Sequence, residues 1–393
     1  MILQQISATL FSLAFIRCAY GRHYASPLAL DAQVSTGAST PTKGTKCAGG
    51  QTVNNAACCA WFPVLEDILP NMFDNECGDD AHGALRLSFH DAISFSPSKG
   101  GGGADGSIIT FNDTELNYAA NDGLQDPVAT EIPFIAAHNV TAGDFIQFAA
   151  GKGITSISYR PTNFHDPTAV SLSLCPGAPQ VGFMMGRPTA KAPAPDGLVP
   201  EPFAPADVVA LLASHSVAGA DTVDPTIPGT PFDSTPSLFD TQIFIEVQLK
   251  GTLFPGQDPG QGEVKSAVEG TMRLQSDSLI ARDNRTSCAW QTLAGQFRSP
   301  IVHMVDPDVS TGNLSGTQSA FKSAFERMAI IGHKAADLID CSDVIPAPIA
   351  LSPVDGPHLP AGQNQKDIEQ ACTTAPFPTF TAQPGPATSV AAM

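Results

Sequence analysis

Hydrophobic residues recur at intervals of three and four along several stretches of this chain, which is the spacing that gathers them on one side of an α-helix. Residues 80–93, "DAHGALRLSFHDAI", show the pattern, with Leu85, Phe89 and Ala92 on one side. Few segments alternate with the period of two that a half-buried strand requires. We therefore expect a mainly α-helical fold, with helices over residues 60–73, 80–93, 141–150, 204–219, 237–251 and 317–339.

Local signals mark the ends of some of these helices. Thr141 and Asp144 have the spacing of a capping box. Pro205 is placed for the start of a helix, where its missing N–H does no harm. Pro63 and Pro70 are expected to bound the first helix.

Long loops separate the helices, in keeping with the 34 Gly and 34 Pro of the chain. Examples are "SPSKGGGGADGS" and "DPTIPGTPFDSTPS". Residues 22–46 are small, polar and aperiodic, and we interpret them as a pro-segment or flexible lead. From residue 346 to 393 the chain is proline-rich, and Cys372 is expected to tie this extended tail to the rest.

The formal net charge of −18 argues against two classes of partner. Nucleic acid and anionic membrane surfaces would both repel such a chain, so we expect no nucleic acid and no membrane as partners. Hydrophobic residues make up 42% of the sequence, enough for a substantial buried core.

The first residues predict secretion. An apolar stretch, Ile6 to Ile16, precedes small residues, and we interpret residues 1–21 as a signal peptide, although no basic residue precedes the stretch. Sequons for N-glycosylation agree with an extracellular protein; they begin at Asn112, Asn139, Asn284 and Asn313.

The nine cysteines fit the same compartment. With Cys18 in the predicted signal peptide, an even number remains, which suggests disulfides. Four bridges allow 105 pairings, so spacing alone leaves the pairing open. The adjacent Cys58 and Cys59 require different partners or a very strained ring.

Arg86 and His90 lie four residues apart in "RLSFHD" and therefore share a helix face. An imidazole can take a proton from one oxygen and return it to another, while a guanidinium stabilises a developing anion. The pair suits heterolysis of an O–O bond. An isolated pair of this kind is more often a surface arginine beside a core histidine.

His215, in "LLASHSVAGAD", is a second histidine in an apolar helix. Histidine is the usual protein ligand of haem iron. Asp277 is a natural carboxylate partner for its other ring nitrogen. The alternative for His215 alone is a core histidine with satisfied hydrogen bonds.

An oxygen-rich loop accompanies each histidine. Each loop mixes carboxylates, hydroxyls and carbonyls, as a calcium site of six to eight oxygens requires. The alternative for either loop alone is a solvated turn. The first set is Asp91, Gly103, Asp105 and Ser107, and the second is Ser216, Asp233, Thr235 and Asp240.

The order of these motifs resembles that of the secreted fungal haem peroxidases, the class II family that includes lignin, manganese and versatile peroxidases. The resemblance runs from Cys47 to about Pro386 and is carried by "CCAWF", "RLSFHD", "GGGGADGS", "CPGAPQ", "SHSVAGADTVDPT", "PFDSTPSLFD", "RLQSDSLIARD" and "DCSDVIP". It implies an all-α haem fold of two helical halves. The haem peroxidase domain would cover residues 47–386, with a distal half at about 47–200 and a proximal half at about 201–345.

The resemblance also implies the roles of individual residues. His90 would take a proton from hydrogen peroxide, Arg86 would stabilise the negative oxygen, Asn121 would orient His90 and Phe89 would pack over the haem. His215 would bind the iron of one haem b, held by Asp277 and packed by Phe232. Leu238 would join the second of two calcium sites. The implied disulfides are Cys47–Cys59, Cys58–Cys341, Cys77–Cys175 and Cys288–Cys372.

The reducing substrate is less sharply defined. Ala210 stands where lignin and versatile types have an exposed tryptophan, which disfavours long-range oxidation by that route. Manganese types bind Mn(II) with three carboxylates, and the matching positions here hold Asp79, Gly83 and Asp221. Asp79 and Asp221 could bind Mn(II) with waters and a haem carboxylate.

Two alternatives stay open. If both acids are ordinary surface residues, the enzyme is a generic peroxidase that oxidises small phenols. The family has a further helix before the proximal one, which is missing here between "VPEPF" and His215. A secreted calcium-binding relative without haem is therefore the second alternative.

Overall fold

The computed structural model describes residues 44–154, 175–198, 203–257, 260–295, 316–346, 351 and 355–393. The predicted signal peptide, residues 1–21, and most of the predicted lead lie outside the described residues, as does Asn313. None of the helices in the described ranges combines the length and apolarity needed to cross a bilayer.

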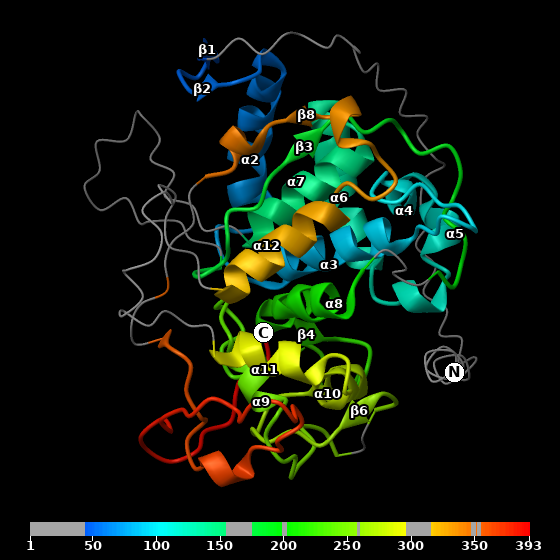
Figure 1. Cartoon of the computed structure of the whole chain (residues 1–393). Helices are drawn as coiled ribbons and strands as arrows, with labels where there is room; N and C mark the ends of the chain where they lie inside the picture. Colours follow the sequence, from blue (N-terminus) through cyan, green and yellow to red (C-terminus); the bar gives the residue numbers. More distant parts are fainter. Residues whose placement is uncertain are drawn as a thin grey trace.

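The described chain is mainly α-helical, as predicted, and its helices form an upper and a lower group (Figure 1). The upper group contains α2 (Trp61–Asn71), α3 (Asp79–Ile93), α6 (Gln125–His138), α7 (Ala142–Ile154) and α12 (Gly316–Met328), with the short α4 (Ser107–Thr110) and α5 (Asn112–Glu115) beside them. The lower group contains α8 (Pro205–Leu211), α9 (Gln242–Glu246), α10 (Gln275–Arg282) and α11 (Ser287–Gly295).

Short antiparallel strand pairs brace the loops. They are β1–β2 (Thr45–Lys46 with Thr52–Val53), β3–β8 (Met184–Met185 with Ile339–Asp340), β4–β5 (Gly219–Ala220 with Thr230–Pro231) and β6–β7 (Glu263–Val264 with Arg273–Leu274). The boundary predicted at residue 47 falls inside the first pair, because β1 belongs to the predicted lead.

The buried hydrophobic residues form two clusters, one within the upper helices and one that joins the lower helices to α12 and part of α3. In the upper cluster the rings of Trp61 and Phe148 lie 4.5 Å apart between centroids. In the lower cluster Trp290 packs 4.9 Å from Phe244 and donates a 2.9 Å hydrogen bond to its carbonyl oxygen. α3 and α8 face each other where the groups meet, and this interface positions the site (Figure 1).

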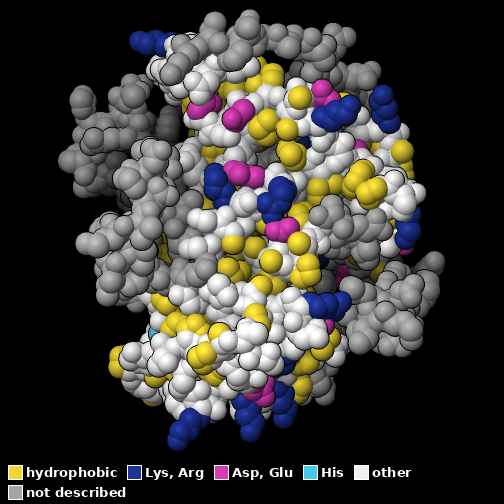
Figure 2. All heavy atoms as spheres, in the orientation of Figure 1, with side chains coloured by type: hydrophobic (Ala, Val, Ile, Leu, Met, Phe, Trp, Pro, Cys, Tyr) yellow, Lys and Arg dark blue, Asp and Glu magenta, His cyan; other side chains and the backbone are white. Residues whose placement is uncertain are grey.

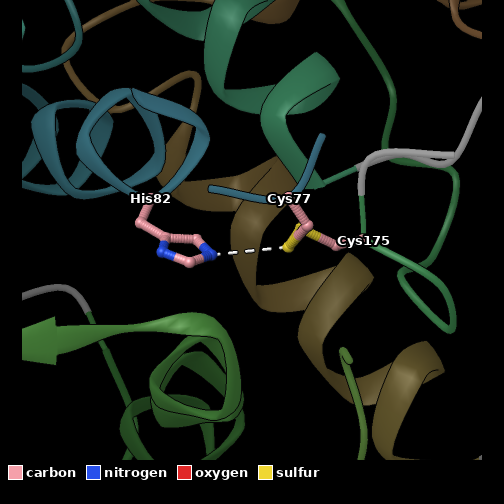
Figure 3. Close-up of side chains that lie close together, drawn as sticks. All are labelled: Cys77, His82 and Cys175. Atoms are coloured by element: carbon pink, nitrogen blue, oxygen red, sulfur yellow. Dashed lines mark hydrogen bonds between the residues drawn. A yellow bond between two sulfur atoms is a disulfide. The ribbon is translucent and has the colours of Figure 1, made fainter. Parts of the chain in front are cut away.

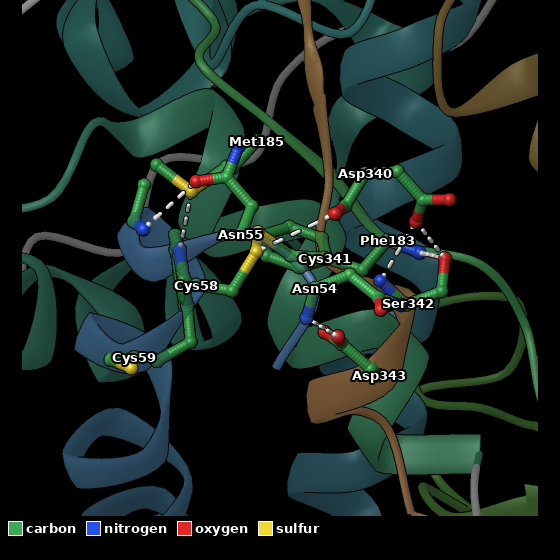
Figure 4. Close-up of a disulfide and its surroundings, with 12 residues drawn as sticks. Asn54, Asn55, Cys58, Cys59, Phe183, Met185, Asp340, Cys341, Ser342 and Asp343 are labelled. Atoms are coloured by element: carbon green, nitrogen blue, oxygen red, sulfur yellow. Dashed lines mark hydrogen bonds between the residues drawn. A yellow bond between two sulfur atoms is a disulfide. The ribbon is translucent and has the colours of Figure 1, made fainter. Parts of the chain in front are cut away.

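All four implied disulfides are present: Cys47–Cys59, Cys58–Cys341, Cys77–Cys175 and Cys288–Cys372. Cys58 and Cys59 therefore have different partners. Cys58–Cys341 joins residues 283 positions apart and sits among further long-range contacts, including the Ser342 hydroxyl bound by the Phe183 N–H at 3.1 Å (Figure 4). Such a bridge removes much of the freedom of the unfolded chain.

The outer surface mixes residue types. Figure 2 shows charged side chains of both signs scattered among hydrophobic ones over one face of the molecule.

Candidate active site

α3 forms the upper wall of a cavity of about 750 Å³ between the two helix groups. The helical spacing of Arg86, Phe89 and His90 turns all three toward this cavity, as the sequence predicted. Two acids in the first turn, Asp79 and Asp80, favour this helix by opposing the positive end of its dipole.

The hydrogen bonds of Asn121 determine which nitrogen of His90 carries the proton. Asn121 Nδ2 donates to the carbonyl oxygen of Glu115 at 2.9 Å, so Asn121 Oδ1 faces His90. His90 Nδ1 lies 2.9 Å from that oxygen and must donate to it. His90 Nε2 is then a lone pair on the cavity side, able to accept a proton.

Burial and charge keep His90 neutral. Burial and then the positive charge of Arg86 lower the pKa of His90, the Asn121 hydrogen bond acts in the opposite direction, and the net pKa is about 4. Arg86 donates a 2.7 Å hydrogen bond to the carbonyl oxygen of Asp122, which holds its guanidinium beside His90. Burial lowers the pKa of Arg86, while the charges of Asp221 and Asp122 favour its charged form.

The lower wall carries His215, on the 3₁₀ turn η3 (Leu212–Val217) that continues α8. Its Nδ1 lies 2.8 Å from Asp277 Oδ2 at the start of α10. A carboxylate only accepts, so Nδ1 carries a proton, and in the neutral ring Nε2 is a lone pair. Burial alone would lower the pKa of His215, but the charge and hydrogen bond of Asp277 outweigh it and raise the pKa. Phe232 packs beside the imidazole, with ring centroids 5.1 Å apart.

The residues around the cavity fit a haem group. Apolar side chains line both walls, including Leu85, Phe203, Leu211 and Leu274. Neither His90 nor His215 has a hydrogen-bond partner at Nε2 among the described residues. The two lone pairs share one cavity that is mostly apolar, as ligand pockets commonly are. His215 could therefore hold iron while His90 works on the other side.

The acids named as a manganese site also lie on this cavity. Asp79 and Asp221 both line it, and burial followed by the negative charge of Asp221 raises the pKa of Asp79. Asp221 Oδ1 accepts the N–H of Gly229 at 2.9 Å. At Gly83 an added Cβ would lie 2.9 Å from Pro127 Cγ, so α6 covers the position where a third carboxylate is absent.

The first predicted calcium set is gathered at the end of α3. Asp91 is fully buried; its Oδ2 accepts the Gly106 N–H at 3.0 Å, and its Oδ1 has no hydrogen-bond partner among the described residues. Burial and the charge of Asp105 raise the pKa of Asp91 well above its ordinary value. Ser107 is buried beside them, and Gly103 has a φ of +76° at a position where an added Cβ would collide with the Ile331 carbonyl group. These oxygens suit a hard cation.

The second set is gathered around the loop after β5. Asp233 Oδ1 accepts the Thr235 N–H at 2.8 Å, and its Oδ2 is buried with no hydrogen-bond partner in the part of the chain that the structure describes. The Asp240 N–H donates to Ser216 Oγ at 3.3 Å, which ties the loop to η3. Burial and the charges of Asp240 and Glu246 raise the pKa of Asp233 well above its ordinary value. Leu238 N–H bonds the Thr235 carbonyl oxygen at 2.8 Å in the same loop.

Among the residues of the cavity wall that sequence reasoning missed are His82 and Met393. His82 lies four residues before Arg86, so its helical spacing was an available signal. Its ring nitrogen approaches the disulfide of Cys77 and Cys175, as Figure 3 shows. These three residues are the group closest to a metal-binding arrangement in the described chain, but both sulfurs are engaged in the disulfide. Met393 is the last described residue and lies on the cavity wall. Hydrophobic periodicity gives no sign that this part of the chain folds back to the cavity.

The aromatic residues bear on the substrate. Trp61 and Trp290 are the two tryptophans of the chain, and both are buried, with 1% and 0% of their surface exposed. Ala210 is buried as well. Neither tryptophan offers a surface site for electron entry.

Comparisons with known proteins agree with this geometry. Residues 65–296 match the family model described as "Peroxidase", and residues 317–393 match the "Fungal peroxidase extension region". Versatile peroxidase VPS1 of Pleurotus eryngii is 46% identical over 401 aligned positions, covering 95% of this chain and 98% of the relative. Manganese peroxidase 3 of Phlebia radiata is 47% identical, covering 91% and 95%. Ligninase H2 of Phanerodontia chrysosporium is 46% identical, covering 93% and 95%. The chain therefore belongs to the fungal class II peroxidases, the ligninolytic peroxidase family.

Proposed function

We propose that this protein is an extracellular haem peroxidase that reduces hydrogen peroxide and oxidises Mn(II), small phenols or both by one-electron steps, as part of lignin degradation. One observation carries the proposal: two histidines on opposite walls of one cavity each use Nδ1 for a fixed acceptor and keep Nε2 free. The signal-like first residues and the disulfides support secretion.

Haem b bound in the cavity would supply an iron centre with an open position for peroxide and the capacity for one-electron chemistry. His215 would hold it, with the Asp277 hydrogen bond making the imidazole a more basic ligand. Phe232 and Phe89 supply apolar contact on the two walls.

The peptide chain itself handles the proton of the peroxide. His90 Nε2 would accept a proton from one oxygen of the peroxide, and the imidazole would return it to the other oxygen, which would leave as water. Arg86 keeps a positive charge beside the departing oxygen in a largely buried site, where such a charge is most effective. Asn121 keeps Nε2, rather than Nδ1, turned to the cavity.

Two calcium ions are part of the proposal. The buried carboxylates of Asp91 and Asp233 each leave one oxygen without a partner beside other oxygens, and calcium would satisfy both. Each ion would anchor a histidine, because Asp91 follows His90 and Ser216 follows His215.

For the reducing substrate, the mutual repulsion of Asp79 and Asp221 supports Mn(II). A cation between them would offset the charge that raises the pKa of Asp79. With Gly83 offering no carboxylate, Mn(II) would keep more water ligands and bind weakly. Phenols remain the second candidate, because the aromatic and apolar cavity wall suits them.

The experiment is a comparison of steady-state oxidation of Mn(II) in a chelating buffer with oxidation of a phenol, in wild type, Asp221→Ala and Asp196→Asn. Asp196 is an exposed acid on the same cavity and serves as the matched control. We expect Asp221→Ala to lose at least about tenfold in kcat/KM for Mn(II) and little for the phenol. Unchanged Mn(II) oxidation in Asp221→Ala would remove the ion site, and absence of a Soret band in the purified wild type would remove the haem peroxidase itself.

A further inference from the structure

Glu246 is a buried carboxylate beside the second predicted calcium site, and the proposed function gives it no role. It ends α9 and has 3% of its surface exposed. Its Oε1 accepts one hydrogen bond from Ser234 Oγ and another, of 3.1 Å, from Gln242 Nε2. A buried carboxylate normally has a cationic side chain or a metal ion as its partner. Among the described residues, both donors to this carboxylate are neutral.

Both donors lie next to residues that are predicted to bind calcium. Ser234 directly follows Asp233 in the loop after β5. Gln242 lies two residues after Asp240, and its backbone N–H donates a 2.8 Å hydrogen bond to Asp240 Oδ1. Glu246 therefore holds two parts of the predicted site through the neighbours of its ligands.

The buried charges around this loop do not balance. Asp233, Asp240 and Glu246 are all buried, and the charges of the second and third act on the first. The buried Arg273 opposes them, since its Nη2 donates a 2.6 Å hydrogen bond to the Glu246 carbonyl oxygen and its charge acts on the Glu246 carboxylate. When these carboxyls are ionised, three negative charges and one positive charge leave an excess that one divalent cation would offset. Asp355 also acts on Asp240, but it is partly exposed, so water screens its charge.

We propose that Glu246 is a positioning residue of the second calcium site: it places the ligand loop through Ser234 and Gln242, and its charge strengthens the attraction for the ion without touching it. The proposal rests on calcium binding at this loop, which is part of the proposed function. Buried surroundings screen charge weakly, so a carboxylate behind the ligands still contributes to binding. Without the ion, the same charge repels Asp233 and Asp240. Glu246 therefore favours the loaded loop and disfavours the empty one.

The test separates the charge of Glu246 from its contacts. Glu246→Gln removes the charge and keeps an oxygen for both hydrogen bonds, whereas Ser234→Ala keeps the charge and removes one contact. Glu263→Gln is the matched control. Glu263, on β6, is also a buried acid and accepts the Gly260 N–H at 2.8 Å, but the acid that acts on it is Asp224, which is not a predicted ligand.

The first readout is the affinity of the holoenzyme for calcium and for terbium(III), a trivalent ion of similar size, in competition with a chromophoric chelator. The second site is the one that is lost in Asp233→Asn. We expect Glu246→Gln to bind calcium there on the order of tenfold more weakly and terbium on the order of thirtyfold more weakly, because the Coulomb energy scales with the charge of the ion. Ser234→Ala should weaken both ions by the same factor, about threefold, and Glu263→Gln should match wild type.

The second readout is thermal unfolding with and without calcium. Loaded Glu246→Gln should have a lower Tm than loaded wild type. After calcium removal its Tm should equal or exceed that of the empty wild type, because the repulsion from Asp233 and Asp240 is gone. A residue that only braces the loop would lower the Tm of both forms.

Three results would overturn the proposal: wild-type calcium affinity in Glu246→Gln, equal losses for calcium and terbium in that variant, or a lower Tm in both of its forms. If Glu246→Gln does not fold, Ser234→Ala carries the test, and wild-type affinity for both ions in that variant would overturn the proposal. A wild type that binds no calcium at this loop would instead refute the calcium site of the proposed function, so the two failures are distinguishable.

Discussion

Gly83 limits the number of carboxylates that the cavity can offer to Mn(II). The position lies on α3 beside Asp79, and Pro127 closes over it so that a Cβ would lie 2.9 Å from Pro127 Cγ. That distance is too short for any side chain unless the stiff proline ring moves. Both the absence of an acid at position 83 and the proline that covers it therefore keep a third carboxylate out of the cavity.

Gly83→Glu alone is expected to destabilise the protein by about 1–3 kcal/mol, the usual cost of overpacking, without improving Mn(II) binding. In Gly83→Glu/Pro127→Ala the Cγ is gone and the remaining Pro127 Cβ contact, at 3.5 Å, is an ordinary one. We expect this double variant to lower the KM for Mn(II) about tenfold through a third carboxylate. Pro127→Ala alone is the control, and a double variant with the wild-type KM would show that the third carboxylate is not what limits binding.

The pH dependence of the reaction with peroxide is a second prediction at this scale. His90 works as a base only when neutral, and burial together with Arg86 lowers its pKa to about 4. The second-order rate constant for peroxide, measured by stopped flow in the Soret band, should be flat above that pH. Below it the rate constant should fall about tenfold per pH unit as His90 is protonated.

Two variants shift this profile in opposite directions. Arg86→Leu removes the positive charge that lowers the pKa of His90, so the fall should begin at higher pH. Asn121→Leu removes the hydrogen bond that raises the pKa, so the fall should begin at lower pH. Shifts in the same direction in both variants would contradict the assignment of these two influences.

Among single residues, the sequence predicted that residues four positions apart on one helix would face the same cavity. Arg86 and His90 were found because four residues separate them on one helix. His82 satisfies the same rule, but its environment depends on a disulfide whose pairing the spacing of cysteines does not determine. Pro127 was missed because it covers Gly83 from a different helix.

At the scale of elements, the predicted helix boundaries were wrong at prolines. Pro63 and Pro70 were expected to bound the first helix, and both lie inside α2. Pro63 sits in the first turn, where its missing N–H has no acceptor to lose. α6 was not predicted, although Val128, Glu131 and Ile135 form a buried face at helical spacing. Pro133 is tolerated within it.

Tertiary contacts shortened another element. Residues 237–251 were expected to form one helix, and only Gln242–Glu246 does so in α9. Before it, the Phe239 N–H bonds the Pro176 carbonyl oxygen at 2.8 Å; after it, the Lys250 N–H bonds that of Asp367 at 2.8 Å. Competing backbone partners on both sides end the helix, and neither is visible in local periodicity. Only one of the two hydrogen bonds of the predicted capping box forms. The Asp144 N–H donates to Thr141 Oγ1, but the Asp144 carboxylate accepts from Arg187 and not from the Thr141 N–H.

Calcium removal tests how the loops are held to their helices. Asp91 joins α3 to the Gly103 loop, and Asp233 and Asp240 join η3 to the loop after β5. Without a cation, burial and mutual repulsion raise the pKa of Asp91 and of Asp233, so both carboxyls hold protons up to higher pH than ordinary acids. We therefore expect the loops to be held less firmly once the cation is removed.

Treatment with EDTA, with calcium loss verified by elemental analysis, is expected to lower the Tm by roughly 5–10 °C and to inactivate the enzyme slowly. Added calcium should reverse the change, whereas Mg²⁺, which demands a smaller octahedral site, should not. An unchanged Tm with full activity after verified calcium removal would show that these oxygens do not hold calcium.

At the scale of the whole molecule, periodicity predicted helices but not their arrangement. α12 and β8, which the predicted division placed in the proximal half, return to the upper group, where β8 pairs with β3. Cys58–Cys341 secures this return across 283 positions. The fold class came from composition and spacing, whereas the two halves and the pairing of cysteines came from the resemblance in the order of motifs. Contacts between residues so distant in sequence leave no local pattern to detect.

The last described residues also fold back, and they reach the active-site cavity. The Val390 N–H bonds the Glu269 carbonyl oxygen at 2.9 Å, and the Met393 N–H bonds that of Gly229 at 2.9 Å. The Met393 side chain then lies on the cavity wall against Gly219, where an added Cβ would be 2.4 Å from its Cε. The bare glycine leaves room for the methionine, so this side chain narrows the cavity beside Asp221.

Met393→Ala should therefore admit larger reductants. We expect kcat/KM for a bulky substituted phenol to rise about threefold to tenfold, with a change of less than about twofold for Mn(II), because a hydrated ion does not need the extra room. Val390→Ala is the matched control, since it also shortens an apolar side chain of this segment but lies outside the cavity wall. Equal gains for the bulky phenol in both variants would mean that loosening of the whole segment, rather than the Met393 side chain, controls access. Parallel gains for Mn(II) and phenol in Met393→Ala would place the effect on the common reaction with peroxide.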